Sequence, residues 1–401
     1  MNKFLMTTVV GTMLLMTANA QNREINFKHD TAFNEVLAEA KQQHKLIFFD
    51  AYTSWCGPCK MMANTVFKTD SVADFFNQNF VNLKVDMEKG EGPKLKDRFG
   101  VSAYPTLLFI DGDGNVIHKL VGSSPSPEFM AESRKALNPE KTVFGLAKKF
   151  DGGDHSAQTA MAYLSALEIA YEHVKMGEVA KIYFDALPKE SLLEKANWEL
   201  EKRFLLDVSS SSFAYLYSKE DELSAMDQKG NVERYFNQVF ATTISSLKRA
   251  HLSNKNLKTA QDKAKAMETL LASNATPFAQ KQLFTLHLTQ LFGNKQWDKY
   301  CQLIDNNLNQ AEKSNAQPIL WAAMEMVREA PVNYCANANK WADAYSTNED
   351  LFTQILVSDL RKMISKKQGN LKEAENFTLN SQNLRKQAGE KGQMTPPMMK
   401  D

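Results

Sequence analysis

Two cysteines, Cys56 and Cys59, lie three positions apart between an apolar run of strand length and a segment with helical spacing. The run, residues 45–52, is almost continuously apolar, which is typical of a central strand covered on both faces. The segment after it, residues 59–67, has the apolar spacing of a helix. A cysteine at the first turn of a helix lies near unpaired backbone amides and the positive end of the helix dipole, which favours its thiolate. We therefore expect Cys56 to be the nucleophile, with Cys59 within disulfide reach and Pro58 stiffening the turn between them.

Helices and strands alternate around these cysteines, which predicts an α/β fold for this part of the chain. The expected helices cover residues 31–43, 71–79, 93–99 and 126–137, and the expected strands cover residues 80–86, 106–111 and 115–121. The last two strands should form a hairpin around Gly112 and Gly114. Ser126 is expected to cap the closing helix, with Pro127 at its first position.

A metal site is an alternative use for the cysteine pair, but the residues do not support it. A closed zinc site needs four ligands, and the remaining cysteines, Cys301 and Cys335, are single and distant, while no pair of histidines has ligand spacing. Residues 111–115 resemble a calcium loop, yet Val116 stands where the loop needs glycine and Gly122 where it needs a bidentate glutamate. We expect no metal and no organic cofactor.

The motif and its surroundings resemble the thioredoxin superfamily over residues 27–137. The resemblance implies a redox-active disulfide between Cys56 and Cys59, and it implies that Asp50 is the buried acid that assists proton transfer with Cys59. Tyr104-Pro105-Thr106 matches the family's cis-proline signature, whose backbone pairs with a bound peptide. The peptide-binding residues implied by the resemblance are Trp55, Gly57, Pro58, Tyr104, Pro105 and Thr106.

In detail, residues 66–80 and 103–106 look like the C-terminal domain of DsbD-type electron transporters and their exported relatives. Two departures from thioredoxin itself bear on the redox potential. Asn82 occupies the place of a lysine near the buried acid, and Tyr104 replaces an aliphatic residue before the proline. Tyr104 could be core packing or could line a peptide groove.

The first 20 residues have the features of a secretory signal peptide. Lys3 supplies a positive charge, residues 4–16 are mostly apolar, and residues 18–20 are small. This apolar core is shorter than the roughly 20 residues needed to span a bilayer, and no later segment approaches such a run. We expect an exported protein that begins at Gln21, without stable membrane insertion after cleavage, and periplasmic if the source is a Gram-negative bacterium.

Beyond Asn138 and Pro139 the sequence predicts helices almost throughout, joined by short polar turns. They are expected over residues 157–173, 192–206, 231–252, 259–271, 279–292, 297–310, 319–328, 349–367 and 371–387. Such helices pack as antiparallel neighbours, which predicts an all-α helical-hairpin array, with one tetratricopeptide-like turn at residues 369–374. The expected organisation is a signal peptide at 1–20, a thioredoxin-like domain at 21–140, an all-helical domain at 141–388 and a flexible tail at 389–401. Cys301 and Cys335 could form a structural disulfide or act as buried apolar side chains.

The 48 basic residues nearly balance the 47 acidic residues, giving a formal net charge of +1 and no net electrostatic attraction to nucleic acid. We therefore expect an exported thiol-disulfide oxidoreductase without a nucleic-acid partner. The Gly-Pro pair resembles that of reducing family members, which implies disulfide-containing client proteins and a membrane thiol-reducing electron donor. A disulfide isomerase or oxidase remains an alternative, because the residues around the pair tune its potential. Another is a client-binding helical scaffold with an accessory redox domain.

Overall fold

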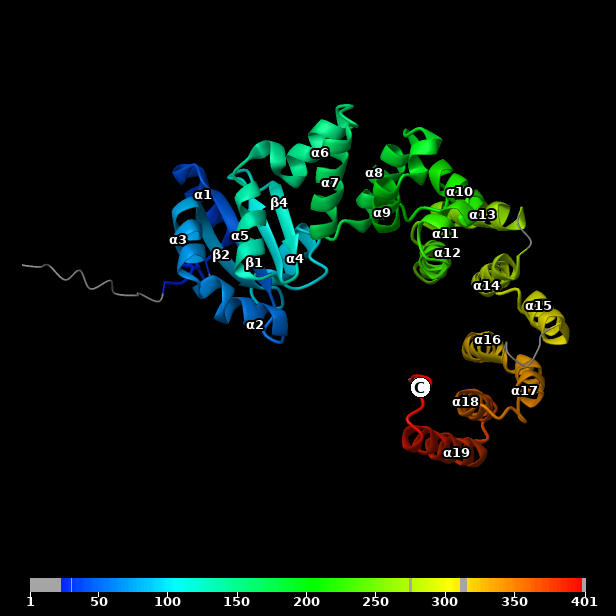
Figure 1. Ribbon diagram of the computed structural model, residues 1–401. Coiled ribbons are helices and arrows are strands. Elements are labelled where there is room, and N and C mark those ends of the chain that lie inside the picture. The colour runs from blue at the N-terminus through cyan, green and yellow to red at the C-terminus, as the bar shows by residue number, and fades with distance from the viewer. Residues whose placement is uncertain (1–22, 30, 274–275, 311–315, 399–401) are drawn as a thin grey trace, which may run out of the picture. The chain divides into compact units, whose positions relative to one another are not determined.

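The computed structural model describes residues 23–29, 31–273, 276–310 and 316–398. The expected signal peptide at 1–20 therefore lies outside the described residues. The chain divides into two compact units, with the boundary between Ala186 and Leu187 (Figure 1). The change of character expected at residue 140 thus lies within the first unit, and the domain boundary proposed there stays a prediction.

A four-stranded sheet forms the centre of the first unit, with strand order β2-β1-β3-β4. Its strands are β1 (Leu46–Tyr52), β2 (Phe80–Asp86), β3 (Thr106–Ile110) and β4 (Val116–Val121). β1 runs parallel to β2 and antiparallel to β3, and β3 and β4 form the expected hairpin. Because β1 is a central strand, its residues from Ile47 to Ala51 are all buried, as the apolar run predicted.

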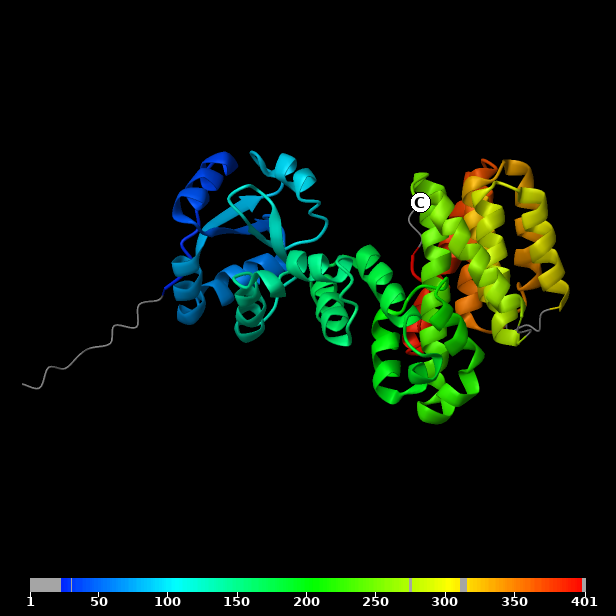
Figure 2. The same ribbon diagram turned by 90° about the horizontal axis from the view of Figure 1, so that it is seen from above.

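Helices cover both faces of this sheet (Figures 1 and 2). They are α1 (Phe33–Gln43), α2 (Gly57–Asn64), α3 (Asp70–Asn79), α4 (Gly92–Arg98) and α5 (Ser126–Lys135). Successive side chains of a strand point to opposite faces, so Phe48 packs with side chains of α2, α3 and α5, whereas Phe49 packs with those of α1 and α4. The cap predicted for the closing helix is one residue out of place, because Pro125 caps α5 and Ser126 is its first residue.

Three further helices belong to the same unit: α6 (Val143–Asp151), α7 (Ala157–Ile169) and α8 (His173–Asp185). α6 packs against β4 and α7. The backbone N–H of Val143 donates to Nδ1 of His118, a β4 residue, over 3.3 Å. Lys119 of β4 pairs with Glu172 at 2.6 Å, and Ile169 packs against the core between the sheet and α5. The helical region therefore begins as a cover on the edge strand of the sheet.

The second unit is all-α in its described residues, as the sequence predicted. Its helices are α9 (Lys195–Phe204), α10 (Ser211–Ser218), α11 (Glu220–Met226), α12 (Lys229–Ser253), α13 (Leu257–Ala272), α14 (Pro277–Gly293), α15 (Trp297–Gln310), α16 (Ala316–Glu329), α17 (Cys335–Ala344), α18 (Leu351–Lys367) and α19 (Leu371–Glu390). From α12 onward they alternate between two rows, with α12, α14, α16 and α18 in one row and α13, α15, α17 and α19 in the other (Figure 1). None of the helices in the described part of the chain has the length and hydropathy needed to cross a bilayer.

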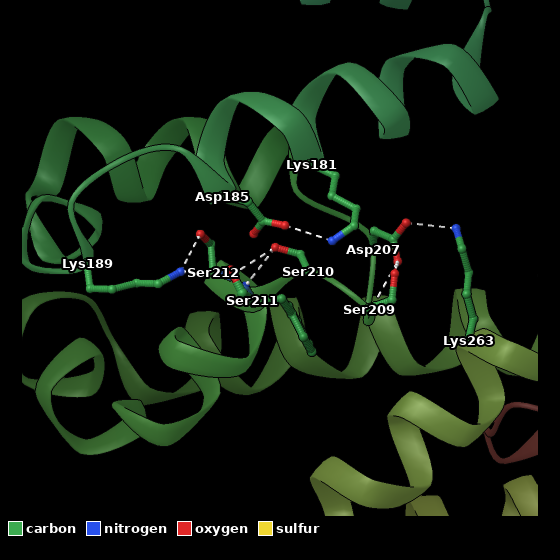
Figure 3. Close-up of polar contacts among 10 residues, drawn as sticks. Lys181, Asp185, Lys189, Asp207, Ser209, Ser210, Ser211, Ser212 and Lys263 are labelled. Atoms are coloured by element: carbon green, nitrogen blue, oxygen red, sulfur yellow. Dashed lines mark hydrogen bonds and ion pairs between the residues drawn. The ribbon is translucent and has the colours of Figure 1, made fainter.

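A polar loop before α10 forms hydrogen bonds and an ion pair with neighbouring elements at the start of the second unit (Figure 3). Asp207 pairs with Lys263 of α13 at 2.9 Å. The ammonium group of Lys189 donates to the hydroxyls of Ser211 and Ser212, at 3.0 and 3.2 Å. These bonds hold the first turn of α10 and the preceding loop against their neighbours in this unit.

Candidate active site

Cys56 and Cys59 lie where β1 has ended and α2 begins, and a disulfide joins them. Cys56 is the N-cap of α2, and its Sγ accepts the backbone N–H of Cys59 at 3.1 Å. Pro58 lies in the first turn, where its missing N–H costs no helix hydrogen bond. Both cysteines are only 3% exposed, so burial does not distinguish them. Their positions do, because only Cys56 has its sulfur at the unpaired amides of the helix start.

Asp50 is buried in the middle of β1, with 1% of its surface exposed. One carboxylate oxygen, Oδ2, forms an ion pair with the Lys84 ammonium. The other oxygen, Oδ1, has no hydrogen-bond partner among the described residues. Burial raises the pKa of this carboxyl, and the charge of Lys84 opposes that rise without cancelling it. Asp50 is therefore a buried acid with one oxygen available to hold a proton.

Lys84 is the cation that the sequence comparison missed. Asn82 occupies the place of thioredoxin's lysine, but Lys84 lies directly opposite Asp50 in the parallel register of β1 and β2. Its ammonium also lies over the aromatic rings of Tyr52 and Phe27, with centroids 4.4 and 5.4 Å away. β1 and β2 pair from their first residues, so counting along both strands from Leu46 and Phe80 would have found this pair.

Trp55 is the exposed aromatic residue of the motif, with 64% of its surface exposed. Its indole Nε1 donates to the Glu88 carboxylate at 3.0 Å. Its ring packs edge-on against the Tyr104 ring, with the two ring centroids 5.8 Å apart. Tyr104 also packs against the core on the α1 and α4 face of the sheet. Tyr104 therefore contributes to core packing and contacts the exposed Trp55 ring, while its role in lining a peptide groove stays a prediction. No sequence motif had indicated Glu88.

The peptide bond between Tyr104 and Pro105 is cis. Pro105 has no N–H, and its carbonyl accepts the N–H of Gly122 at 2.9 Å. Pro105 therefore has no N–H to offer a peptide, and its carbonyl already accepts one hydrogen bond; its expected role in peptide binding stays a prediction. The amide and carbonyl of Tyr104 have no hydrogen-bond partner in the described residues. Thr106 is buried, and its hydroxyl donates to the Ala103 carbonyl at 2.8 Å; its expected contact with a bound peptide stays a prediction.

Cys301 and Cys335 belong to the second unit, whereas the cysteine pair belongs to the first. Both thiols are free and buried in one apolar cluster. The Cys301 sulfur lies 3.6 Å from the sulfur of Met326. The disulfide considered for these residues is not formed, and they act as small apolar side chains.

Comparison with known proteins agrees with this geometry. A family model described as a thioredoxin-like domain matches residues 33–137. Thioredoxin H4 of Arabidopsis thaliana is 40% identical over 88 residues, which cover 22% of this chain and 69% of the relative. This chain belongs to the thioredoxin superfamily.

Two solved structures are also similar to the thioredoxin-like part of the chain. A solution structure from Bacteroides thetaiotaomicron, of a candidate disulphide-isomerase, is 48% identical and covers 30% of this chain and 98% of its own, with a TM-score of 0.28. The oxidised C-terminal domain of DsbD from Neisseria meningitidis is 22% identical and covers 27% of this chain and 97% of its own, with a TM-score of 0.25.

The thioredoxin-like fold and the cysteine pair support thiol-disulfide oxidoreductase activity. Such chemistry passes through a mixed disulfide, formed when a thiolate attacks a disulfide sulfur.

Proposed function

We propose that this thioredoxin-like protein reduces disulfides of client proteins. The Cys56 thiolate attacks one sulfur of a client disulfide, forming a mixed disulfide and releasing the other client sulfur as a thiolate. The Cys59 thiol then loses its proton, and its sulfur attacks the Cys56 sulfur. The internal disulfide forms again, and the client leaves with both of its sulfurs reduced. Two electrons pass from the cysteine pair to the client.

The hydrogen bond from the Cys59 N–H to the Cys56 sulfur carries this assignment. In the reduced protein the same amide would donate to the Cys56 thiolate, and bonding to the charged form favours ionisation. Cys59 lies within the first turn of α2, three residues after Cys56 and already joined to it by a disulfide, so its sulfur is placed for internal attack on the Cys56 sulfur. Cys56 is therefore the attacking cysteine and Cys59 the resolving one.

Asp50 is the proton acceptor for Cys59 in this proposal. Its unpartnered Oδ1 and its raised pKa suit a group that takes up a proton within the protein interior. Lys84 is a positioning residue, since it holds the other carboxylate oxygen and limits the rise in the pKa of Asp50. The free amide and carbonyl of Tyr104 are the groups that would pair with the client backbone.

To reduce further client disulfides, the protein must have its own Cys56–Cys59 disulfide reduced again after each cycle. Export places the protein among oxidants, where the pair would rest as the disulfide unless a thiol donor reduces it. We infer a membrane thiol-reducing protein as that donor and the exported, periplasm-like space as the location. The N-terminal residues 1–20 and the Gly57-Pro58 pair support this part of the proposal.

The test combines trapping with a redox titration. Cys59→Ser should accumulate client mixed disulfides, Cys56→Ser should accumulate none, and the matched control Cys301→Ser should behave as the unchanged protein. Equilibration with glutathione should give a potential nearer about −270 mV, the value of thioredoxin, than about −120 mV. A potential above roughly −180 mV, the range of disulfide isomerases, would contradict the proposed reductase function and favour an isomerase or oxidase function.

A further inference from the structure

A groove in the second unit is lined by four consecutive helices, α12 to α15, which belong to both rows (Figure 1). Its volume is about 640 Å³. Asparagine and glutamine make up 50 of the 401 residues of the chain, but they supply six of the thirteen described residues that line this groove. Carboxamide side chains are therefore concentrated here. They are Gln261, Gln290, Asn294, Gln296, Gln302 and Asn306.

The same short sequence pattern forms two walls of the groove. Gln-Leu-x-x-Asn occurs at residues 290–294, where α14 ends, and again at residues 302–306 in α15. Helix positions three and four apart lie on one face, so each wall presents two carboxamides and a leucine to the groove. Because only residues 294–296 separate the two helices, α14 and α15 are antiparallel neighbours. The two carboxamide rows therefore run side by side.

These carboxamides are available to a ligand. Gln290 is half-buried and the other five are exposed. None of the six side chains forms a hydrogen bond within the part of the chain that the structure describes. Each carboxamide is uncharged and carries an oxygen that accepts and an NH₂ group that donates two hydrogen bonds. The groove thus suits a ligand that also carries both donors and acceptors.

Contacts between the helices hold the groove in shape. The imidazole Nε2 of His287 on α14 hydrogen-bonds to the Glu268 carboxylate of α13 at 3.0 Å. The ring of His251 on α12 lies so close to Gly293 that a Cβ atom there would come within 2.3 Å of it. Leu247 is fully buried and belongs to the floor. The carboxamides are therefore carried by packed helices, which lowers the ordering cost of binding.

The rest of the lining argues against charged ligands and nucleobases. Among the lining residues that the structure describes, Lys299 alone has a fixed charge and no carboxylate is present. A metal cation would therefore lack the carboxylates that usually bind it, and a polyanion would meet a single ammonium group. The same residues include no phenylalanine, tyrosine or tryptophan on which a nucleobase could stack. The lining favours a neutral ligand rich in hydrogen-bonding groups.

The spacing of the carboxamides matches an extended polypeptide backbone. Gln290 and Asn294 are four residues apart, which is about 6 Å along a helix that rises 1.5 Å per residue. Gln302 and Asn306 repeat this spacing on the other wall. In an extended chain the N–H and C=O groups of one edge recur every second residue, about 6.6 Å at about 3.3 Å per residue. The side-chain torsions of glutamine can absorb the small difference.

We propose that this groove binds the backbone of an extended, uncharged segment of a partner polypeptide. The carboxamides donate to its carbonyls and accept from its N–H groups, as a neighbouring strand would. Leu291 and Leu303 contact its apolar side chains. Because every sequence has the same backbone groups, the groove accepts partners of differing sequence. The site belongs to the second unit, needs no redox chemistry and does not rest on the proposed reductase function.

Fluorescence anisotropy with the full chain tests this binding. The probe is a labelled ten-residue peptide of alternating serine and leucine, blocked at both ends. The control peptide has the same sequence with N-methylated backbone amides, which removes the backbone donors and leaves the side chains unchanged. Neither contains cysteine, so failure of the reductase proposal would not affect the result. The probe should bind at least about tenfold more tightly than the control, a difference of about 1.4 kcal/mol. Raising the salt concentration should leave its affinity unchanged, because the contacts join uncharged groups.

Matched variants locate the site. Gln290→Ala combined with Gln302→Ala removes a carboxamide from each wall and should weaken probe binding at least about tenfold. Gln302→Ala combined with Asn306→Ala changes only exposed residues and should weaken it to a similar extent. Gln238→Ala, which removes an exposed carboxamide of α12 that does not line the groove, should change the affinity by less than about twofold. Circular dichroism checks that each variant is folded.

Two results would overturn the proposal: equal binding of the probe and its N-methylated control, or an unchanged affinity in both double variants. Displacement of the probe by a neutral oligosaccharide at equal concentration would also overturn it, in favour of a carbohydrate site.

Discussion

The contact between α6 and the edge strand β4 predicts that a chain cut after residue 138 is less stable than one cut after residue 186. The shorter fragment loses the Val143 hydrogen bond to His118, worth about 1 kcal/mol. It also loses the half-buried Ile169, worth about 1 kcal/mol for partial burial of such a side chain. The partly exposed ion pair of Lys119 with Glu172 adds at most about 0.5 kcal/mol. The fragments should therefore differ by about 2–3 kcal/mol.

Urea unfolding followed by far-ultraviolet circular dichroism measures this difference. With a slope of about 1–3 kcal/mol per molar urea for small domains, the midpoint for residues 23–138 should lie about 1–2 M below that for residues 23–186. Lys119→Gln in the longer fragment is the matched control, because it removes only the ion pair and should shift the midpoint slightly. Coincident midpoints for the two fragments would refute the reasoning and restore residue 140 as the limit of the folding unit.

Three further predictions follow from buried titratable groups. Burial lowers the pKa of His118 to about 4; stability should therefore fall by about 3 kcal/mol as the pH drops from about 6.5 to 4, and His118→Gln should reduce that loss in pH-dependent urea titrations. Burial raises the pKa of Glu201 to about 8, so its ionisation costs stability as the pH rises from 4.5 towards 8, and Glu201→Gln should show a smaller decline in thermal midpoint over that range. The free thiols Cys301 and Cys335 are buried, and burial raises the pKa of Cys301 to about 12; a thiol reagent should label them only after unfolding, and labelling in the folded protein would contradict their placement.

Local sequence patterns predicted most of the thioredoxin-like part. The apolar run of β1 and the helix after the cysteines depend on neighbouring residues, and both were found near their expected places. The contact of α6 with β4 was not predicted, because it depends on how segments distant in the sequence meet. α6 and α8 were also missed as helices.

In the candidate active site, too, features set by neighbouring residues were predicted, whereas contacts between distant segments were not. The motif placed Cys56 at the start of a helix and Asp50 in a buried strand. Lys84 was missed because residue-by-residue comparison with thioredoxin directed attention to Asn82, whereas strand register decides which side chain faces Asp50. The motif directed attention to the Pro105 backbone, whereas the proposal assigns peptide pairing to Tyr104, because only the structure shows that the Pro105 carbonyl accepts the N–H of Gly122.

The order in which the two active-site thiols react tests the account most directly. The reduced protein is treated briefly with iodoacetamide at mildly acidic pH, and the labelled positions are identified by mass spectrometry. Because the Cys59 N–H and the start of α2 stabilise the Cys56 thiolate, Cys56 should be labelled first while Cys59 stays protected, and Cys301 and Cys335 should remain unlabelled as internal controls. Preferential labelling of Cys59 would contradict the assignment of attacking and resolving cysteines.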